Sequence, residues 1–396
     1  MKVITGVRRC GKSYLMSTLF KDHLLAAGVP PENIIEFSFE GYANAKYRNP
    51  EVTYPLIKSR LLPGRNFLLL DEVQLLKDFV PVLTEFMRMP GVDVYVTGSN
   101  AKQLSKDIAT EFRGRGDQIH LRPLSFSEFM NAYDGPREAG IREYSLFGGL
   151  PTVVLKDTPE EKMEELETLL SEVYLNDIEQ RNKIRKKQEF SRLLDVVASS
   201  IGSLASPAKL ADTFSSVLHA KISPATVQKY LGYLDDAFLI ETGSRYDIKG
   251  RKYIGAPFKC YFTDLGLRNA RLHFRQHEEP HVMENIVYNE LRTRRFNVDV
   301  GVVQYRYRNP ENQFLRGSLE VDFVCNKGYE RYYVQSALTI KDAKKASEEK
   351  RPLLGIDDSF RKVIVVDDPV PTYHDEKGIL IVNLLEFLTN PRSLDL

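Results

Sequence analysis

The distribution of apolar residues along the chain predicts an α/β fold at the N-terminus. Continuous apolar runs at residues 2–6, 33–39, 66–71 and 92–97 are separated by turns or by stretches with apolar residues at helical spacing. Such runs are typical of strands that are buried on both faces of a parallel sheet. A shorter strand is expected at residues 118–121.

The middle of the chain has the pattern of helices followed by a hairpin. A glycine-proline break at residues 148–151 separates a helical hairpin from a long helical pattern at 159–177. Within residues 190–263, helical stretches precede a two-stranded ribbon, and Ser223 and Pro224 suit the N-cap and the first helical position of one of these helices. This order predicts a winged helix-turn-helix.

The last part of the chain has the element order of the PD-(D/E)xK nuclease core. A helix at residues 281–291 is followed by a hairpin, a strand, a helix and another strand. We therefore expect a P-loop ATPase core at 1–135, a helical lid or linker at 136–188, a winged helix-turn-helix at 189–270 and a nuclease-like α/β domain at 271–396.

Composition and charge narrow the classes of protein. A chain of 396 residues is long enough for two or three domains. Its net charge of +1 means that overall charge predicts no nucleic-acid partner, so any basic surface must be local. Its three cysteines are widely spaced, which fits a reducing cytosol. The sequence has no apolar run as long as a membrane span and no signal-peptide pattern, so a cytoplasmic protein without a membrane partner is expected.

The strongest chemical motif is the phosphate-binding loop G-x-x-x-x-G-K-S at residues 6–13, which follows the first strand and opens a helix. Its backbone N–H groups and the helix N-terminus suit a polyphosphate. Lys12 is expected to reach the β- and γ-phosphates, and the Ser13 hydroxyl is expected to ligate Mg²⁺. The residues predicted to contact ATP are Gly6, Arg9, Cys10, Gly11, Lys12, Ser13 and Tyr14.

Two carboxylates follow the third strand, at the edge where open α/β sheets place their chemistry. Asp71 is expected to complete the Mg²⁺ shell, and Glu72 to orient and deprotonate the attacking water. After the next strand, Asn100 or Ser99 is the candidate contact to the γ-phosphate and water, although either residue also suits a helix N-cap.

Arg113 and Arg115 lie in a glycine-rich segment and have two interpretations. One of them acts as an arginine finger in a neighbouring subunit, or the pair is a surface feature that binds a local carboxylate. The first interpretation predicts a homo-oligomer, either a ring or a dimer.

A basic ribbon tip with an aromatic residue suits contacts to DNA phosphates. The candidate DNA-binding residues are Lys229, Arg245, Lys249, Arg251 and Lys252. The alternative is a winged helix that serves only protein packing. A basic run at residues 181–187 is either a solvated face or a further phosphate contact.

The nuclease-like segment has an incomplete catalytic set. Glu284 and Asp322 match the first two acidic positions of the PD-(D/E)xK core, but the third element has Gln335 and no lysine two residues later. Because a neutral amide is a poor Mg²⁺ ligand, this pattern favours a vestigial site in a binding or scaffold domain. Migration of Lys341 or Lys344 into the site is the alternative.

From end to end, the chain resembles the prokaryotic AAA-type ATPases that carry a C-terminal domain of unknown function (number 4143). The resemblance rests on the strings T-G-V-R-R-C-G-K-S at 5–13, L-D-E-V-Q at 70–74, F-R-G-R-G at 112–116, P-L-S-F-S-E-F at 123–129, F-G-G-L-P at 147–151, R-Y-D-I-K-G at 245–250, D-L-G-L-R-N-A at 264–270 and M-E-N at 283–285. It implies ATP hydrolysis, a ring or dimer, and a C-terminal half that binds DNA or another partner. Relatives usually have a lead segment before the first strand, so the adenine end of the site is less well specified here than the phosphate end.

These patterns favour a Mg²⁺-dependent AAA-type ATPase that binds or remodels DNA, duplex or branched as in Holliday junctions. One alternative is a nucleotide-gated signalling or defence switch whose C-terminal half binds a protein. A second is a Mg²⁺-dependent nuclease.

Overall fold

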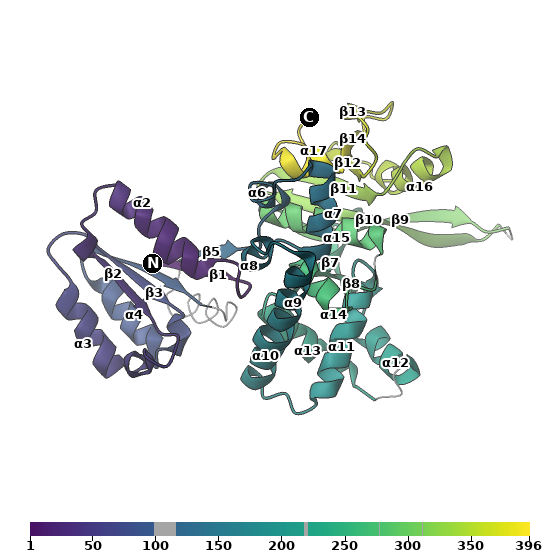
Figure 1. Ribbon diagram of the computed structural model, residues 1–396. Helices are drawn as coiled ribbons and strands as arrows, with labels where there is room; N and C mark the ends of the chain where they lie inside the picture. The colour runs from purple at the N-terminus through teal and green to yellow at the C-terminus, as the bar shows by residue number, and fades with distance from the viewer. Residues whose placement is uncertain (99–115, 218–220, 277, 311) are drawn as a thin grey trace. The chain divides into compact units, whose positions relative to one another are not determined.

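The computed structural model describes residues 1–98, 116–217, 221–276, 278–310 and 312–396 (Figure 1). These residues form two compact units. The first comprises Met1–Arg122 with Asp236–Phe238, and the second comprises Pro123–Asp235 with Leu239–Leu396. The predicted four-segment division, with boundaries at residues 135, 188 and 270, stays a prediction.

The first unit contains a five-stranded parallel sheet in the order β2-β3-β4-β1-β5. This confirms the predicted parallel α/β core. Its strands are β1 (Lys2–Gly6), β2 (Ile34–Ser38), β3 (Asn66–Asp71), β4 (Val92–Thr97) and β5 (Asp117–Leu121). Its helices are α1 (Lys12–Tyr14), a π-helical turn (Leu15–Phe20), α2 (Lys21–Ala26), α3 (Pro50–Arg60) and α4 (Phe79–Arg88), with short 3₁₀ turns at Pro31–Asn33, Ala45–Arg48 and Val73–Leu75.

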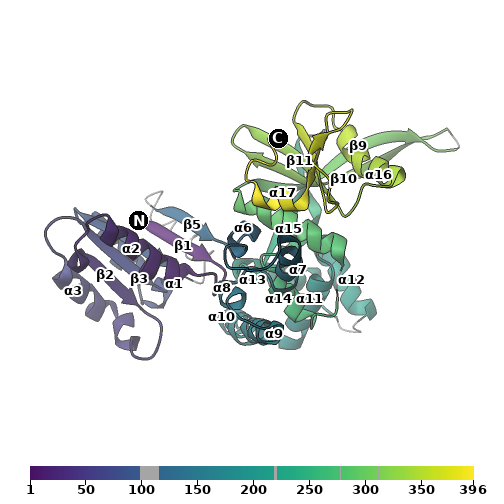
Figure 2. The ribbon, with the colours of Figure 1, turned by 45° about the horizontal axis from the view of Figure 1, so that its top comes forward.

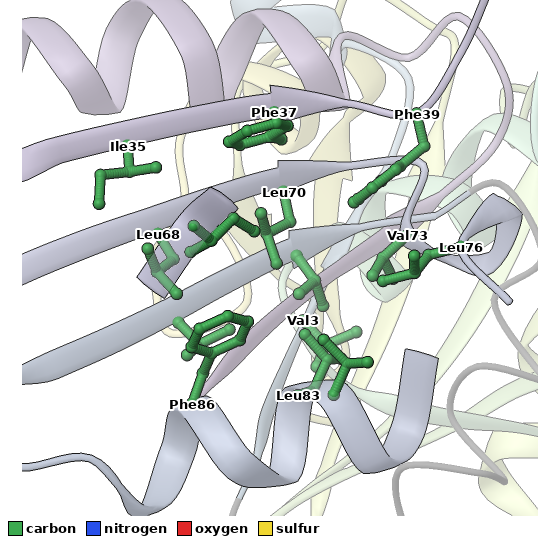
Figure 3. Close-up of a cluster of buried hydrophobic side chains, with 14 residues drawn as sticks. Val3, Ile35, Phe37, Phe39, Leu68, Leu70, Val73, Leu76, Leu83 and Phe86 are labelled. Atoms are coloured by element: carbon green, nitrogen blue, oxygen red, sulfur yellow. The ribbon is translucent and has the colours of Figure 1, made fainter. Parts of the chain in front are cut away.

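Both faces of this sheet are buried, which explains its continuous apolar strands. Leu68 and Leu70 of β3 belong to one core cluster, and Figure 3 shows Leu83 and Phe86 of α4 pointing toward them. The intervening residues of β3, such as Leu69, face the other cluster, which includes Met16 of the π-helical turn and Leu24 of α2. Side chains of a strand alternate between faces, so a strand covered on both sides needs apolar residues at every position.

Helices form the first half of the second unit. They are α6 (Phe126–Phe129), α7 (Arg137–Phe147), α8 (Pro151–Val154), α9 (Pro159–Thr168), a π-helical stretch (Leu169–Leu175), α10 (Asn176–Arg181), α11 (Lys187–Ser199), α12 (Pro207–Val217) and α13 (Pro224–Asp236). Helix α6 opens with a capping box, in which Ser125 and Glu128 satisfy each other's backbone N–H groups.

The rest of the second unit is built on one nine-stranded sheet in the order β13-β14-β12-β11-β10-β9-β7-β8-β6, and Figure 1 labels most of its strands. Its strands are β6 (Leu204–Ala205), β7 (Ile240–Asp247), β8 (Lys252–Phe262), β9 (Asn297–Arg308), β10 (Phe314–Lys327), β11 (Glu330–Ala337), β12 (Arg361–Val366), β13 (Tyr373–His374) and β14 (Leu380–Asn383). The remaining helices are α14 (Leu265–Arg271), α15 (Glu279–Thr293), α16 (Ala343–Leu354) and α17 (Leu384–Thr389). Parallel pairing of β7 with β9 makes the sheet continuous across residue 270.

Two of the distinctive strings in the sequence contact each other in this unit. The Gly149 N–H donates to Asp264 Oδ2 at 2.8 Å, and Asn269 Nδ2 donates to the carbonyls of Ser145 and Leu146 at the end of α7. Gly148 has a φ of 74°, and a Cβ there would lie 2.2 Å from Asp264 Oδ1. The glycines of the F-G-G-L-P string therefore serve close packing against α14.

No helix in the described ranges is long and apolar enough to cross a membrane.

Candidate functional site

The phosphate-binding loop joins β1 to α1 in a tight, left-handed turn. Gly6, Arg9 and Gly11 all have positive φ angles of 148°, 63° and 95°. A Cβ at Gly6 would lie 2.1 Å from the carbonyl oxygen of Leu121, so only glycine fits between the loop and β5. The arrangement places the start of α1 directly after the loop, as the motif predicts.

The ammonium group of Lys12 lies inside the loop. Its Nζ donates to the carbonyls of Gly6 at 3.2 Å and Val7 at 2.9 Å, and the residue is buried. A buried ammonium held by carbonyl groups can exchange them for phosphate oxygens, which are stronger acceptors because they are charged.

The two predicted metal residues meet at the carboxyl ends of β1 and β3. Ser13 Oγ donates to Asp71 Oδ1 at 2.8 Å. In the described part of the chain, no group of three or more acidic, histidine or cysteine side chains is placed to hold a metal ion. This oxygen pair fits Mg²⁺ that is bound mainly through phosphates and water, since Mg²⁺ in nucleotide sites takes few protein ligands.

Thr97, at the end of β4, joins Asp71 to Glu72. Its hydroxyl donates to Asp71 Oδ1 and accepts the backbone N–H of Glu72 at 3.0 Å, and the side chain is fully buried. Sequence reasoning missed this residue, because it placed the polar contact of this strand at Asn100 or Ser99. Both of those residues lie outside the described residues, as do Arg113 and Arg115.

Glu72 leaves the strand in an unusual backbone conformation. Its φ and ψ of 52° and 49° are left-handed, a region that a residue with a side chain rarely adopts. Gln74 Nε2 donates a hydrogen bond to its carboxylate. The chain therefore turns away from the line of β3 at Glu72. Gln74 is a partner of the Glu72 carboxylate that the sequence pattern did not indicate.

The other predicted nucleotide contacts differ in exposure. Arg9 is exposed, and Tyr14 is 61% exposed on α1. Cys10 is buried with its Sγ 3.5 Å from the Leu121 carbonyl, and burial raises the pKa of its thiol. Its side chain therefore packs the loop against β5, and only its backbone is suited to phosphate.

A second polar cluster surrounds Lys259 on β8, within the second unit. Its Nζ lies 2.8 Å from Glu284 Oε1, 2.8 Å from Glu320 Oε1 and 3.7 Å from Asp322 Oδ1. Tyr261 also donates to Glu284, at 2.7 Å. The structure thus brings together Glu284 and Asp322 as predicted and adds a buried lysine that sequence reasoning missed, although a lysine inside the apolar run 258–262 was a visible signal.

The titratable groups of this cluster have pKa values that are shifted in different directions. Burial and the neighbouring Glu284 raise the pKa of Asp322 to about 7, against the opposing effect of Lys259. Burial alone would raise the pKa of Glu284, but His281 and Lys259 outweigh it and lower that pKa. The pKa of Lys259 is raised, because its carboxylate neighbours outweigh burial. Lys259 and Glu284 therefore form a charged pair, and Asp322 is the carboxyl group that titrates near neutral pH.

Gln335 is adjacent to the cluster, and Lys341 is not part of it. The Gln335 carbonyl accepts the backbone N–H of Asp322 at 3.3 Å, and its amide donates to Glu349 at 3.2 Å. Lys341 pairs with Asp368 at 3.0 Å, so its predicted migration into this site is wrong. Lys344 is an exposed residue at the start of α16.

The candidate DNA-binding residues occupy four settings. Lys249 and Arg251 line a hollow of about 650 Å³ beside the β7–β8 turn, and Lys252 begins β8 as an exposed residue. Lys229 lies on α13 with its Nζ 5.7 Å from the ring centre of Tyr233. Arg245 is partly buried, and its Nε has no hydrogen-bond partner among the described residues.

Comparisons with known proteins agree with the nucleotide site. Residues 1–130 match the AAA domain family, and residues 138–278 match a domain of unknown function (DUF8612). An uncharacterized protein of Haemophilus influenzae is 30% identical over 402 residues, covering 98% of this chain and 94% of that protein. The uncharacterized protein MJ1544 of Methanocaldococcus jannaschii is 27% identical over 388 residues, covering 93% and 85%.

Two solved structures are similar at low scores. The Aeropyrum pernix ORC1 protein in complex with DNA has a TM-score of 0.26 at 14% identity, covering 69% of this chain and 86% of that one. PCH-2 of C. elegans has a TM-score of 0.26 at 14% identity, covering 60% of each chain. From the end-to-end match, the chain belongs to the same family as the Haemophilus influenzae protein, and its first 130 residues are an AAA domain.

Proposed function

We propose that this protein is a Mg²⁺-dependent ATPase. The observation that carries the proposal is the network at the carboxyl ends of three neighbouring strands, in which Ser13 meets Asp71 at 2.8 Å and Thr97 links Asp71 to Glu72. The AAA domain match at residues 1–130 supports the same assignment.

Each side chain of the network has a role in this proposal. Lys12 binds the β- and γ-phosphates, and Ser13 and Asp71 hold the metal ion. Mg²⁺, when bound, neutralises charge that develops on the phosphate oxygens. Glu72 orients the attacking water and accepts its proton. Thr97 fixes the carboxylate of Asp71 and the backbone of Glu72, so that both groups face the same space.

Glu72→Gln and Lys12→Ala test this assignment together. We expect Glu72→Gln to lower kcat by about 10²- to 10⁴-fold while ATP still binds, because only the proton acceptor is lost. Lys12→Ala removes a phosphate contact, and we expect it to weaken ATP binding itself. ATP hydrolysis by Glu72→Gln at the wild-type rate would contradict the role of this carboxylate.

We also propose that ATP hydrolysis is coupled to DNA binding through a winged helix-turn-helix. The order α11, β6, α12, α13, β7, β8 supports this, with β6 and β7 each antiparallel to β8. In that fold α13 is the recognition helix and the β7–β8 turn is the wing, which carries Lys249, Arg251 and Lys252.

ATPase rates with and without linear or four-way DNA test the coupling. We expect DNA to stimulate hydrolysis and its binding to weaken steeply with salt. If nucleotide changes the oligomeric state and DNA has no effect at low salt, the coupling to DNA is wrong and a protein-binding switch replaces it.

For the C-terminal segment we propose a binding scaffold of PD-(D/E)xK ancestry. The order α15, β9, β10, β11, α16, β12 supports this relationship. Lys259 supports the loss of cleavage, because its ammonium group already pairs with both Glu284 and Glu320. A cleavage assay with Mg²⁺ comparing the wild type with Asp322→Ala is the test, and we expect no cleavage above background from either. Cleavage that disappears in Asp322→Ala would establish a nuclease instead.

A further inference from the structure

A long hairpin extends from the nine-stranded sheet of the second unit and reaches beyond α16 (Figures 1 and 2). It consists of the outer halves of β9 and β10, whose antiparallel pairing continues to Arg308 and Phe314. We call residues 304–310 and 312–318 of this hairpin the arm. The sequence pattern predicted only the inner parts of these strands, 298–305 and 318–324.

The register divides the arm into two chemically different faces. Arg306 is directly opposite Arg316, and Arg308 is directly opposite Phe314, so these four residues share one face. The other face carries Tyr305, Tyr307 and Leu315, since side chains alternate along a strand. We call the first the arginine face.

The other face of the arm contacts the unit at Tyr305. The guanidinium of Arg351 on α16 lies 5.3 Å from the ring centre of Tyr305, a cation–π contact. The arginine face is exposed at all three arginines, and Phe314 is 67% exposed. The contact at Tyr305 therefore holds the base of the arm, and the arginine face is open, as are Tyr307 and Leu315 on the other face.

Within the described part of the chain, no carboxylate pairs with the arginines of the arginine face. Like charges directly opposite each other destabilise a strand pair. Among the residues that the structure describes, neither Arg306 nor Arg316 has a carboxylate partner. Arg308 donates to the neutral amide oxygen of Asn312 at 3.0 Å, and its guanidinium carbon lies 4.5 Å from the ring centre of Phe314. This arrangement carries a cost in the free protein, and bound anions would relieve it.

The shape of the arm indicates which polyanion fits. A two-stranded ribbon fits the major groove of B-DNA, and guanidinium groups make bidentate contacts with phosphates. An exposed aromatic ring beside an arginine adds an apolar surface for sugar or base edges. Farther down the same face, Glu320 Oε1 lies 2.8 Å from Lys259 Nζ, which offsets part of the acidic charge at the base of the arm.

We propose that the arginine face of the arm, with Arg306, Arg308 and Arg316, binds the backbone of duplex DNA. This inference rests on the proposed DNA-binding function and adds a surface that is separate from the β7–β8 turn. In this arrangement the winged helix and the arm both contact the duplex.

The test compares Arg306→Ser/Arg316→Ser with Arg137→Ser/Arg142→Ser, which removes the same charge from exposed positions of α7. Binding of a fluorescent duplex is measured by anisotropy over a series of salt concentrations. We expect the arm variant to bind the duplex at least roughly tenfold more weakly than the wild type does. The plot of log K against log salt concentration should also become less steep, its slope decreasing in magnitude by about 2, because two phosphate contacts are lost. The α7 variant is expected to bind as the wild type does.

Thermal unfolding without DNA excludes a folding defect as the cause. Removing two opposed arginines should leave the melting temperature unchanged or higher, since their repulsion is lost. Duplex binding by the arm variant with the affinity and slope of the wild type would overturn the inference while leaving the proposed function intact. A single strand that binds the wild type as tightly as the duplex would also overturn it. Absence of any DNA binding by the wild type at low salt would instead overturn the proposed function.

Discussion

Thr97 controls two groups of the nucleotide site through one buried hydroxyl. Thr97→Val keeps the shape of the side chain but removes the hydrogen bonds to Asp71 and to the Glu72 N–H. Since a buried N–H left without a partner costs about 1–3 kcal/mol, we expect Glu72 to shift. We expect kcat for ATP hydrolysis to fall roughly 10- to 100-fold with little change in KM, as for a misplaced water-orienting group.

Thr97→Ser is the matched control, because it restores the hydroxyl while removing one methyl group. Steady-state ATPase kinetics of the two variants, with thermal unfolding beside them, separate positioning from folding. If Thr97→Val hydrolyses ATP at the wild-type rate, or if both variants lose activity equally, Thr97 has only a packing role.

Residues whose identity follows from a local motif could be predicted from sequence, and those defined by distant contacts could not. Lys12, Ser13 and Asp71 lie in such motifs, and the structure places Ser13 against Asp71. Thr97 and Lys259 gain their importance from partners 26 and 25 positions away in the sequence. A threonine ending a strand and a lysine within one are ordinary residues until those partners are known.

At the scale of elements, β8 supplies the charge that holds β10 and α15 together. The side chain of Lys259 is 4% exposed and contacts Glu284 of α15 and Glu320 of β10. Lys259→Met leaves these carboxylates without their cation. We expect unfolding free energy to fall by about 3–5 kcal/mol, the usual cost of breaking a buried ion pair from one side.

Chemical unfolding of Lys259→Met beside Lys252→Met gives the measurement and its control. Lys252 starts the same strand but is exposed, so its substitution should change stability by no more than about 0.5 kcal/mol. The double variant Lys259→Met/Glu284→Gln should recover part of the loss, because the uncompensated charge is removed. Equal stability of Lys259→Met and wild type would show that the cluster contributes nothing to the fold.

Asp322 gives the same cluster a pH dependence of defined sign. Its pKa is raised from 3.8 to about 7, chiefly by burial and then by Glu284, so the folded state holds a proton that the unfolded state releases. This contribution is fully present below pH 4 and is lost as pH rises through 7. Between those values it lowers unfolding free energy with a slope of up to about 1.4 kcal/mol per pH unit.

Asp322→Asn keeps a neutral side chain of the same shape and should remove this slope. The informative quantity is the difference in unfolding free energy between wild type and variant at pH 5 and pH 7. We expect the wild type to lose stability relative to Asp322→Asn as the pH rises. A constant difference over this range would show that Asp322 does not titrate there.

The kinds and order of elements were predictable, whereas their pairing was not. Apolar runs predicted β1 to β4, and the Ser223 and Pro224 signals predicted α13, because these depend on local patterns. The parallel contact of β7 with β9 joins residues more than fifty positions apart, such as Arg245 and Val300. The outer half of the β9–β10 hairpin was missed because its alternating arginines and tyrosines lack a buried face.

At the scale of the whole molecule, the arginine-finger interpretation of the glycine-rich segment predicts that one subunit completes the nucleotide site of another. Arg113 and Arg115 lie outside the described residues, and their proposed role comes from their position in the sequence. Lys12→Ala chains keep both arginines but lose their own phosphate contact. Chains with Arg113→Ala/Arg115→Ala keep the phosphate-binding loop but lose the candidate arginine finger.

Mixing these two inactive variants decides whether the arginines act between subunits. In a randomly mixed dimer, half of the assemblies contain one of each chain, and each of those has one complete site. We therefore expect ATPase activity to return to about a quarter of the wild-type rate for a dimer, from two preparations that are each inactive. The recovered activity should fall on dilution, because it depends on association. An arginine that acts within its own chain, or only at the surface, cannot complement a different chain, so the absence of recovery in a mixture that still associates would contradict action between subunits.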